Sequence, residues 1–177
     1  MGRKTFTVKK ECRITGRIQV EESGLKWRNW GDSGVFMGEY SHALDEKGRL
    51  IIPARLREEL GSRFVMTKGL DGCLFLYPLS EWNKMEERLK SLPLTNANAR
   101  AFARLFLAGA QDVEVDRQFR VTIPPRLREY AGVLKDIVLV GVSNRVELWA
   151  DSRWAEYQAQ AQSTYEEVAE KMVDFGF

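Results

Sequence analysis

The sequence predicts an α+β protein, mainly β with added helices, in which two copies of one small unit form a single pseudo-symmetric barrel. The first observation is an internal repeat: Leu44–Gly61 aligns with Val115–Gly132 at an offset of 71 residues, and nine of the eighteen aligned pairs are identical. The second is that each copy contains short β-rich runs between turn signals. The third is size. A unit of about 40 residues buries too little surface to fold alone, so we expect the copies to interleave their strands.

Each copy begins with two short strands around a turn. In the first copy, SHALD (41–45) and RLII (49–52) favour strands, and Gly48 supplies the positive φ that a tight connection needs. In the second copy Phe119 stands in place of Gly48. Because a side chain disfavours positive φ, the sequence predicts a looser turn, or a turn of another geometry, at Phe119.

A short helix and a second hairpin complete each copy. Pro53 opens the helical segment ARLREEL, and Gly61 is a natural stop. The run FVMTKGLDGCLFLYPL then predicts a hairpin with its turn at residues 69–72. In the second copy, IVLVGVSNRVELW predicts the same hairpin with its turn at residues 143–144.

Two helices are predicted between the copies. Ser80 is expected to cap the first, Thr95 to begin the second, and Gly109 to end it. Their apolar residues recur at helical spacing. These are Trp82, Met85 and Leu89 in the first helix, and Phe102, Leu105 and Phe106 in the second.

A long apolar stripe follows the second copy. Its residues recur at spacings of three and four: Trp154, Tyr157, Ala161, Tyr165, Val168, Met172 and Phe175. Two interpretations remain open at this point. The stripe packs on its own barrel, or part of it meets a neighbouring subunit.

The predicted organisation has five parts. They are an N-terminal extension at 1–35, a first module at 39–83, a helical connector at 84–111, a second module at 112–155 and a C-terminal helix at 156–177. Residues 1–34 lie outside the repeat, and we expect them to be a translated leader from an upstream start site or a disordered segment.

Charge is distributed unevenly along the chain. The net charge is +2, but residues 1–36 hold eight basic and four acidic side chains, which leaves 19 basic and 21 acidic side chains in the remainder. A nucleic-acid-binding surface would therefore have to be a local basic face.

The sequence shows neither a membrane span nor a secretion signal. It has no apolar run of eighteen residues, and its first residues lack an apolar h-region. We therefore expect a cytoplasmic protein without a membrane partner. Cys12 and Cys73 lie far apart, and Cys73 sits in an apolar run, so a reduced, buried thiol is expected there.

Patterns typical of enzymes are missing from the sequence. There is no Gly-rich phosphate loop, no His/Cys metal spacing and no nucleophile elbow. The one histidine, His42, lies in an expected strand, where a packed or surface role is predicted. We therefore expect a protein that is not an enzyme and needs neither metal nor cofactor.

The repeated charges bracket the first turn of each copy. Asp45 and Arg49 have counterparts in Asp116 and Arg120, and residues four apart across a turn can pair. One interpretation is an ion pair that staples the hairpin, which contributes little when exposed. The other is an arginine held ready to bind a phosphate or a guanine edge with two N–H groups, with Lys47 as a further phosphate partner.

Each predicted short helix carries two further arginines, Arg55 and Arg57 in one and Arg126 and Arg128 in the other. Helical positions two apart point about 200° from one another. One arginine of each pair can therefore face a ligand while the other pairs locally, for example Arg55 with Glu59.

Several segments together resemble the MraZ family of bacterial transcriptional regulators. They are FMGEYSHALDEKGRLIIPARLREEL (36–60), the second DxxxR copy, LFLYPLSEW (74–82) and LVGVSNRVELW (139–149). The resemblance runs from Phe36 to the end of the chain and implies two tandem swapped-hairpin half-barrels of AbrB/SpoVT type in one double-psi-like barrel. The family pattern is broken at Phe119 and by the N-terminal extension.

The resemblance also implies a function. It implies a nucleoid-associated repressor of its own operon, the division and cell-wall gene cluster, which binds G-rich direct repeats in double-stranded promoter DNA as a ring-like homo-oligomer. Arg49 and Arg120 would contact DNA, oriented by Asp45 and Asp116, although Phe119 is expected to affect the aim of Arg120. Further implied contacts are Lys47, Arg55, Arg57, Arg126 and Arg128. The alternative is an AbrB-type antitoxin or scaffold module that binds protein through its helices.

Overall fold

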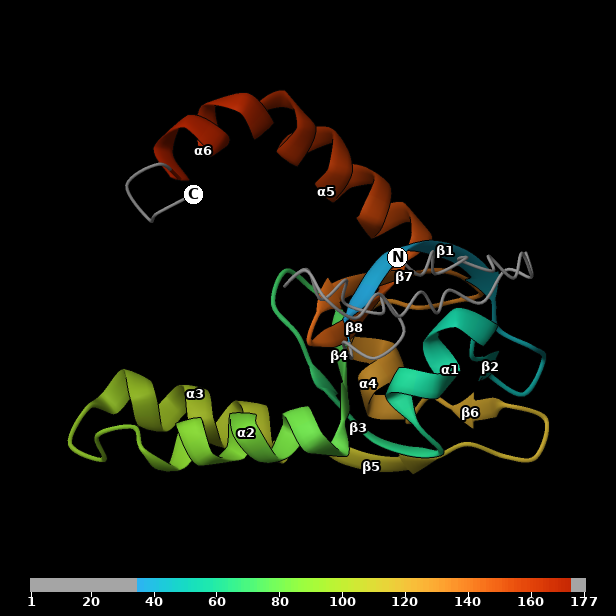
Figure 1. The fold of residues 1–177 in the computed structure, drawn as a ribbon, viewed down its shortest axis with the longest axis horizontal. Coiled ribbons are helices and arrows are strands. Elements are labelled where there is room, and N and C mark those ends of the chain that lie inside the picture. Colours follow the sequence, from blue (N-terminus) through green and yellow to red (C-terminus); the bar gives the residue numbers. More distant parts are fainter. Residues whose placement is uncertain (1–34, 173–177) are drawn as a thin grey trace, which may run out of the picture. The chain divides into compact units, whose positions relative to one another are not determined.

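The computed structural model describes residues 35–172 (Figure 1). The predictions for residues 1–34, Cys12 and Phe175 lie outside the described residues. The strands are β1 (Phe36–Ala43), β2 (Arg49–Ile51), β3 (Arg63–Lys68), β4 (Leu74–Pro78), β5 (Gln111–Glu114), β6 (Arg120–Thr122), β7 (Asp136–Ser143) and β8 (Arg145–Ala150). The helices are α1 (Ala54–Leu60), α2 (Leu79–Lys90), α3 (Ala97–Ala108), α4 (Pro125–Tyr130), α5 (Asp151–Ser163) and α6 (Tyr165–Met172).

The strands of the two copies are interleaved, as the sequence predicts. One antiparallel sheet has the order β1-β7-β8-β4-β3-β5, and a second, two-stranded sheet pairs β2 with β6. Each of the four strands of the first copy pairs with a strand of the second copy. The strands on either side of the first turn, β1 and β2, lie in different sheets. This confirms an α+β fold of two tandem swapped-hairpin modules.

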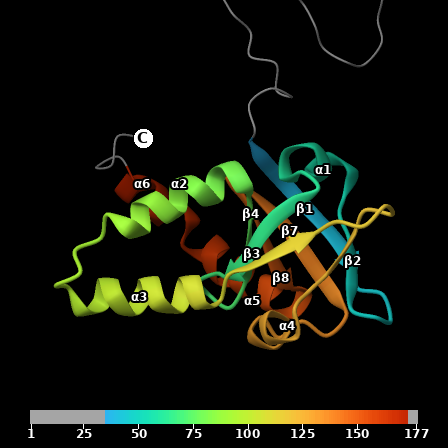
Figure 2. The ribbon, with the colours of Figure 1, turned by 90° about the horizontal axis from the view of Figure 1, so that it is seen from below.

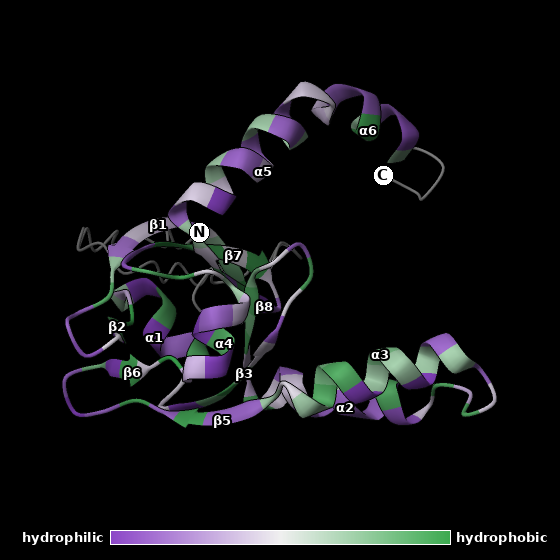
Figure 3. Ribbon diagram, turned by 180° about the vertical axis from the view of Figure 1, so that it is seen from behind, coloured by the Kyte–Doolittle hydropathy of each residue, from purple (hydrophilic) through white to green (hydrophobic). Residues whose placement is uncertain are grey.

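The main core lies between the two sheets and the short helices α1 and α4. Leu50 of β2 and Val121 of β6 point into it and are almost completely buried, as are Leu56 of α1 and Leu127 of α4. Figure 3 shows that hydrophobic residues gather on the central strands β7 and β8. Because both modules contribute to this core, neither has an apolar interior of its own.

Both predicted hairpins are confirmed. Strands β3 and β4 pair across the turn at residues 69–72, and β7 and β8 pair across Ser143-Asn144. Gly61 ends α1 with a positive φ of 76°, as expected of a C-terminal glycine. Pro53 stands one place before the first helical residue and is therefore the residue that caps α1.

Helices α2 and α3 lie side by side and cover a second, aromatic core (Figures 1 and 2). Trp82 of α2 stacks on Phe106 of α3 with ring centres 5.8 Å apart, and Tyr77 of β4 packs beneath them. Met85 and Leu89 complete the predicted inner face of α2. On α3 the predicted apolar face is buried only at Phe106. Phe102 and Leu105 are 44% and 68% exposed.

The predicted starts of these two helices are both wrong. Helix α2 follows β4 directly, so Pro78 is its cap and Ser80 already lies in the first turn. Helix α3 is capped by Asn96 and not by Thr95, because the Asn96 side chain accepts hydrogen bonds from the backbone N–H groups of Asn98 (2.9 Å) and Ala99 (3.2 Å).

The apolar stripe of the C-terminal segment packs on the barrel only at its beginning. Trp154 and Tyr157 lie against Trp149 of β8, with ring centres 5.4 and 5.0 Å away. The helix is interrupted at Thr164, and beyond it Tyr165, Val168 and Met172 are exposed. The prediction of self-packing therefore holds for the first two turns of α5.

Cys73 is buried in the aromatic core and forms no disulfide, as predicted. Burial raises the pKa of its thiol well above the ordinary value. Among residues 35–172, no helix is both long and apolar enough to cross a bilayer.

Candidate nucleic-acid interface

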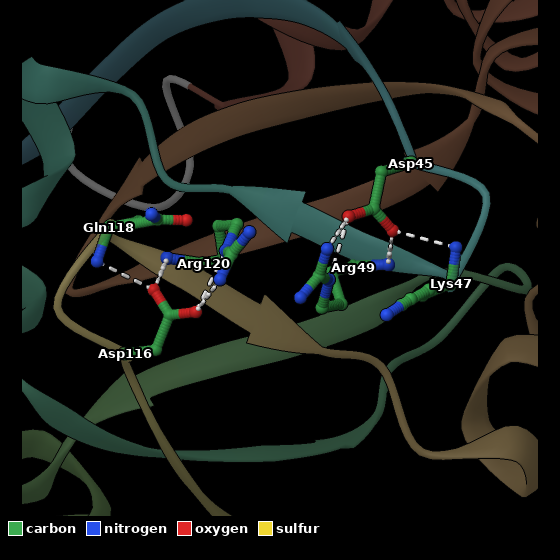
Figure 4. A network of polar contacts seen from close by, with 6 residues as sticks. All are labelled: Asp45, Lys47, Arg49, Asp116, Gln118 and Arg120. Atoms are coloured by element: carbon green, nitrogen blue, oxygen red, sulfur yellow. Dashed lines mark hydrogen bonds and ion pairs between the residues drawn. The ribbon is translucent and has the colours of Figure 1, made fainter.

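The β2–β6 sheet is a two-stranded ribbon that presents two arginines on one face (Figure 4). Arg49 lies opposite Thr122, and Arg120 lies opposite Ile51. Because side chains alternate along a strand, these four residues share the outer face, while Leu50 and Val121 point into the core. The arginines therefore occupy diagonal corners of the same exposed surface.

The first turn is held by the side chain of Asp45. Its Oδ1 accepts hydrogen bonds from the backbone N–H groups of Lys47 and Arg49, both at 2.9 Å. Gly48 has a positive φ of 70°, and its N–H donates to the Asp45 carbonyl at 2.9 Å. This arrangement is an Asx turn, in which a short acidic side chain satisfies the amides of a tight bend.

The second oxygen of Asp45 binds the arginine. Oδ2 accepts from Nε of Arg49 at 2.7 Å and lies 2.6 Å from its Nη2. A guanidinium has five N–H groups, so this contact leaves the Nη1 donors and one Nη2 donor directed elsewhere. Arg49 is thus fixed in position and still has donors to offer.

The second turn repeats this geometry almost atom for atom. Oδ1 of Asp116 accepts from the N–H groups of Gln118 (2.8 Å) and Arg120 (2.9 Å), and Oδ2 binds Nε (2.8 Å) and Nη2 (2.7 Å) of Arg120. The side chains of Arg49 and Arg120 are equally exposed, at 26%. The second pair is therefore as well organised as the first.

The prediction of a looser or different turn at Phe119 is wrong. Phe119 adopts a positive φ of 60°, close to that of Gly48, and so does not re-aim Arg120. Two contacts compensate for the strain of a bulky residue in this conformation. Asp116 holds the turn amides, and the Arg57 guanidinium lies 4.0 Å from the centre of the Phe119 ring.

The arginines also determine the ionisation of the two aspartates. The hydrogen bond from Arg49 lowers the pKa of Asp45 from 3.8 to about 2, and Arg120 lowers the pKa of Asp116 in the same way to about 2. Both carboxylates therefore stay ionised at acid pH values where an ordinary aspartate would take up a proton.

The helix arginines divide into two kinds. Nε of Arg57 donates to the Ile52 carbonyl at 2.8 Å, while Arg128 donates to the carbonyls of Val133 (3.0 Å) and Leu134 (2.8 Å). Arg55 and Arg126 are exposed. One arginine of each pair thus bonds locally, as predicted, but to backbone carbonyls. Among the ion pairs of residues 35–172, Arg55 with Glu59 does not occur.

Sequence reasoning missed three residues of this surface. Arg117 is exposed at the tip of the second turn, where the first turn carries Glu46, and Ile51 and Thr122 are exposed beside the arginines. The repeat alignment pairs Arg117 with Glu46 and therefore contained the signal. The outer position of Ile51 and Thr122 becomes clear only from the cross-copy register.

His42 lies on β1, in a polar hollow that Asp136 and Asp151 also line. Within residues 35–172, no group of three or more His, Cys, Asp or Glu side chains is placed to hold a metal ion. Among the described residues, the two Asp–Arg pairs of the ribbon are the charged arrangement that both copies repeat.

Known proteins match this chain over the whole described region. A family model described as "MraZ protein", antitoxin-like, matches residues 35–105 and again residues 106–176. A protein of Heliobacterium modesticaldum named "Transcriptional regulator MraZ" is 58% identical over 141 residues, which cover 80% of this chain and 99% of that protein. A protein of the same name from Moorella thermoacetica is 60% identical over the same shares. A third, from Pelotomaculum thermopropionicum, is 60% identical over 79% of this chain and 97% of its own length.

Proposed function

The chain belongs to the MraZ family, and from that premise we propose that it is a transcriptional regulator that binds double-stranded DNA through the β2–β6 ribbon. The observation that carries the proposal is the diagonal pair Arg49 and Arg120, each fixed by an aspartate and each with donors left over. A two-stranded ribbon fits the major groove, and a guanidinium can bind O6 and N7 of guanine with two N–H groups.

Phosphate contacts would come from the exposed cations around the ribbon. Lys47 and Arg117 stand at the two turn tips, and Arg55 and Arg126 begin the short helices beside it. Asp45 and Asp116 orient the two arginines. In this proposal Arg57 and Arg128 support the turns of the ribbon, because their guanidinium groups bond to backbone carbonyls.

We further propose that the protein acts as a ring-like homo-oligomer on direct repeats. From residue 37 onward the chain has more acidic than basic side chains, so one copy would bind weakly and in a salt-sensitive way. Several copies on adjacent G-rich repeats would gain roughly 10²–10⁴ in affinity through effective concentration. The exposed apolar residues of α6, Tyr165, Val168 and Met172, offer a surface for such association.

The proposed target is the promoter of the protein's own operon, the division and cell-wall gene cluster, which the protein would repress as part of the nucleoid. The support is family membership together with the ribbon geometry. Repression requires that the bound oligomer cover the promoter, which several repeats near the transcription start would ensure.

The experiment is a fluorescence-anisotropy titration of the full chain against the duplex directly upstream of its own coding sequence, at two salt concentrations. Arg49→Ala and Arg120→Ala should each weaken binding by about five- to 150-fold, since a bidentate contact contributes about 1–3 kcal/mol. Arg88→Ala removes the same charge from the exposed face of α2 and should bind normally. Equal binding by all four proteins would contradict the proposal.

A second candidate function is a protein-binding antitoxin or scaffold module. The apolar side chains of Phe102 and Leu105 on α3 favour it, because both remain exposed among the described residues. This function predicts that the full chain ignores the upstream duplex at low salt while a protein partner stays bound to Arg49→Ala and Arg120→Ala alike.

A further inference from the structure

The two halves of the ribbon are nearly equivalent in their charged contacts. Arg49 and Arg120 are held by the same kinds of hydrogen bond, at distances that differ by about 0.1 Å. A DNA-binding surface with two equivalent halves binds a site equally well in either orientation. Copies bound to direct repeats must all point the same way, so some residue has to distinguish the two halves.

The turn tips differ in charge, with Glu46 in the first and Arg117 in the second, and they differ most in side-chain size at the position before the arginine. The first turn has Gly48, and the second has Phe119, next to Arg120. The phenyl side chain is 47% exposed. A bulky residue at positive φ is a strained choice, and here Phe119 lines a hollow together with Arg57 and with Asp116, the ion-pair partner of Arg120.

The surroundings of Phe119 are built to hold its ring. Arg57 is anchored by its hydrogen bond to the Ile52 carbonyl and lies over the phenyl group, 4.0 Å from its centre. In the first turn the corresponding arginine, Arg128, approaches the backbone so closely that a Cβ on Gly48 would meet its Nη1 at 2.7 Å. The same scaffold therefore presents a ring in one half, whereas in the other half a side chain would have to displace Arg128.

From this difference we infer that Phe119 contacts DNA bases and gives the ribbon a direction. The inference rests on the proposed function. A phenyl group cannot bond to phosphate, and the apolar group that a base pair displays in the major groove is the C5-methyl of thymine. Phe119 would pack on a thymine methyl next to the base read by Arg120. Arg57 is a positioning residue that keeps the ring in place.

The first half then has a different requirement. With Gly48 at its tip, it accepts any base beside the one that Arg49 contacts. Each DNA site consequently has one end that requires a thymine, under Phe119, and one end that accepts any base, under Gly48. This polarity would align successive copies head to tail along the duplex.

The experiment uses the upstream duplex in which each thymine in turn is replaced by deoxyuracil, which lacks only the methyl group. The full chain should lose about fourfold in affinity at one thymine per repeat, the factor that corresponds to burying one methyl group. Phe119→Gly should bind the unmodified duplex about fourfold more weakly than the parent chain and be insensitive to that replacement. Phe119→Asn, a residue that tolerates positive φ, should behave in the same way.

A matched control is Phe102→Ala, which removes an aromatic ring of similar exposure from α3 and should keep the methyl sensitivity. Circular dichroism verifies that each variant is folded. If the full chain binds the duplex through Arg49 and Arg120 but every deoxyuracil replacement is neutral, or if Phe119→Gly remains sensitive, the inference is overturned while the proposed function stands. If the full chain does not bind the duplex at all, both are overturned.

Discussion

The guanidinium of Arg57 covers the ring of Phe119 at 4.0 Å, so a helix of the first module supports the turn of the second. Arg128 of the second module reaches the first turn in return, close to Gly48. Each turn of the ribbon thus lies next to an arginine from the other half of the chain. Substitutions in the turns, the ion pairs, the core and the helical surface can show how much each of them contributes to stability, DNA binding and self-association.

Replacing Asp45 should separate its two tasks. Asp45→Asn keeps an oxygen for the N–H groups of Lys47 and Arg49, so it should lower the free energy of unfolding only slightly, as expected for the loss of an exposed ion pair. Asp45→Ala also loses the turn acceptor and should destabilise the protein more. Urea denaturation measures both changes. Equal losses for the two variants would show that the turn amides do not need the side chain.

The pH dependence follows from the lowered pKa values of Asp45 and Asp116, both about 2. The folded state holds these carboxylates ionised more strongly than the unfolded state, whose pKa is near 3.8. Their contribution to stability is therefore present above about pH 4 and is lost as the pH falls through about 2. NMR titration of the carboxyl carbons should give midpoints near 2, and Arg49→Ala should return the Asp45 midpoint toward its ordinary value. An unchanged midpoint in that variant would rule out Arg49 as the cause.

The ribbon should be tied to the folding of both modules. Leu50 is completely buried in the shared core, so Leu50→Ala should lower the free energy of unfolding by about 2–5 kcal/mol. Ile51 is 48% exposed on the outer face, and Ile51→Ala should cost less than about 1 kcal/mol. Far-UV circular dichroism and tryptophan fluorescence should report the same single transition. Two separate transitions would mean that the modules unfold independently.

The glycines at positive φ offer a test of the turn itself. A methyl group on Gly61 would meet its nearest neighbour, the Arg63 carbonyl oxygen, at 3.9 Å, so Gly61→Ala should cost only backbone strain, about 1–3 kcal/mol, because its φ of 76° and ψ of −175° are essentially restricted to glycine. Gly48→Ala also places a side chain at positive φ and should displace Arg128, so it should destabilise the protein as well. Calorimetry measures both. DNA affinity should fall for Gly48→Ala and remain normal for Gly61→Ala, and the reverse order would contradict the assigned interface.

The exposed stripe of α6 should determine the size of the oligomer. Val168→Asp places a charge on that stripe and should lower the molar mass measured by light scattering at a fixed concentration. Ala169→Asp introduces the same charge about 100° around the helix and should have a smaller effect. If Val168→Asp keeps the mass of the parent chain, α6 does not carry the contact between copies.

Much of the fold could be predicted from the sequence. The internal repeat revealed a unit of about 40 residues, and a unit of that size is too small to fold alone, which implied that the strands of the two copies interleave. The prediction of paired charges at the turns also agrees with the geometry of Asp45–Arg49 and Asp116–Arg120. What local rules missed depended on distant residues. The turn at Phe119 is stabilised by Arg57, which is 62 positions away in the chain, and no local preference contains that contact.

Other errors arose where neighbouring residues have similar preferences. Thr95 and Asn96 are both good helix caps. The Asn96 N–H donates to the Pro93 carbonyl and closes a turn before α3, so Asn96 is the cap and the helix begins one residue later than predicted. The interruption of the C-terminal helix at Thr164 was also not predicted, because the apolar spacing continues through it without a proline or glycine.

Interleaving has a consequence during synthesis. Strands β1 and β2 leave the ribosome before their partners β7 and β6 exist, and β4 waits for β8, which ends at Ala150. At about 5–20 residues per second, the early strands spend several seconds with open edges. A nascent chain of this protein thus exposes unpaired strand edges until its second half has emerged.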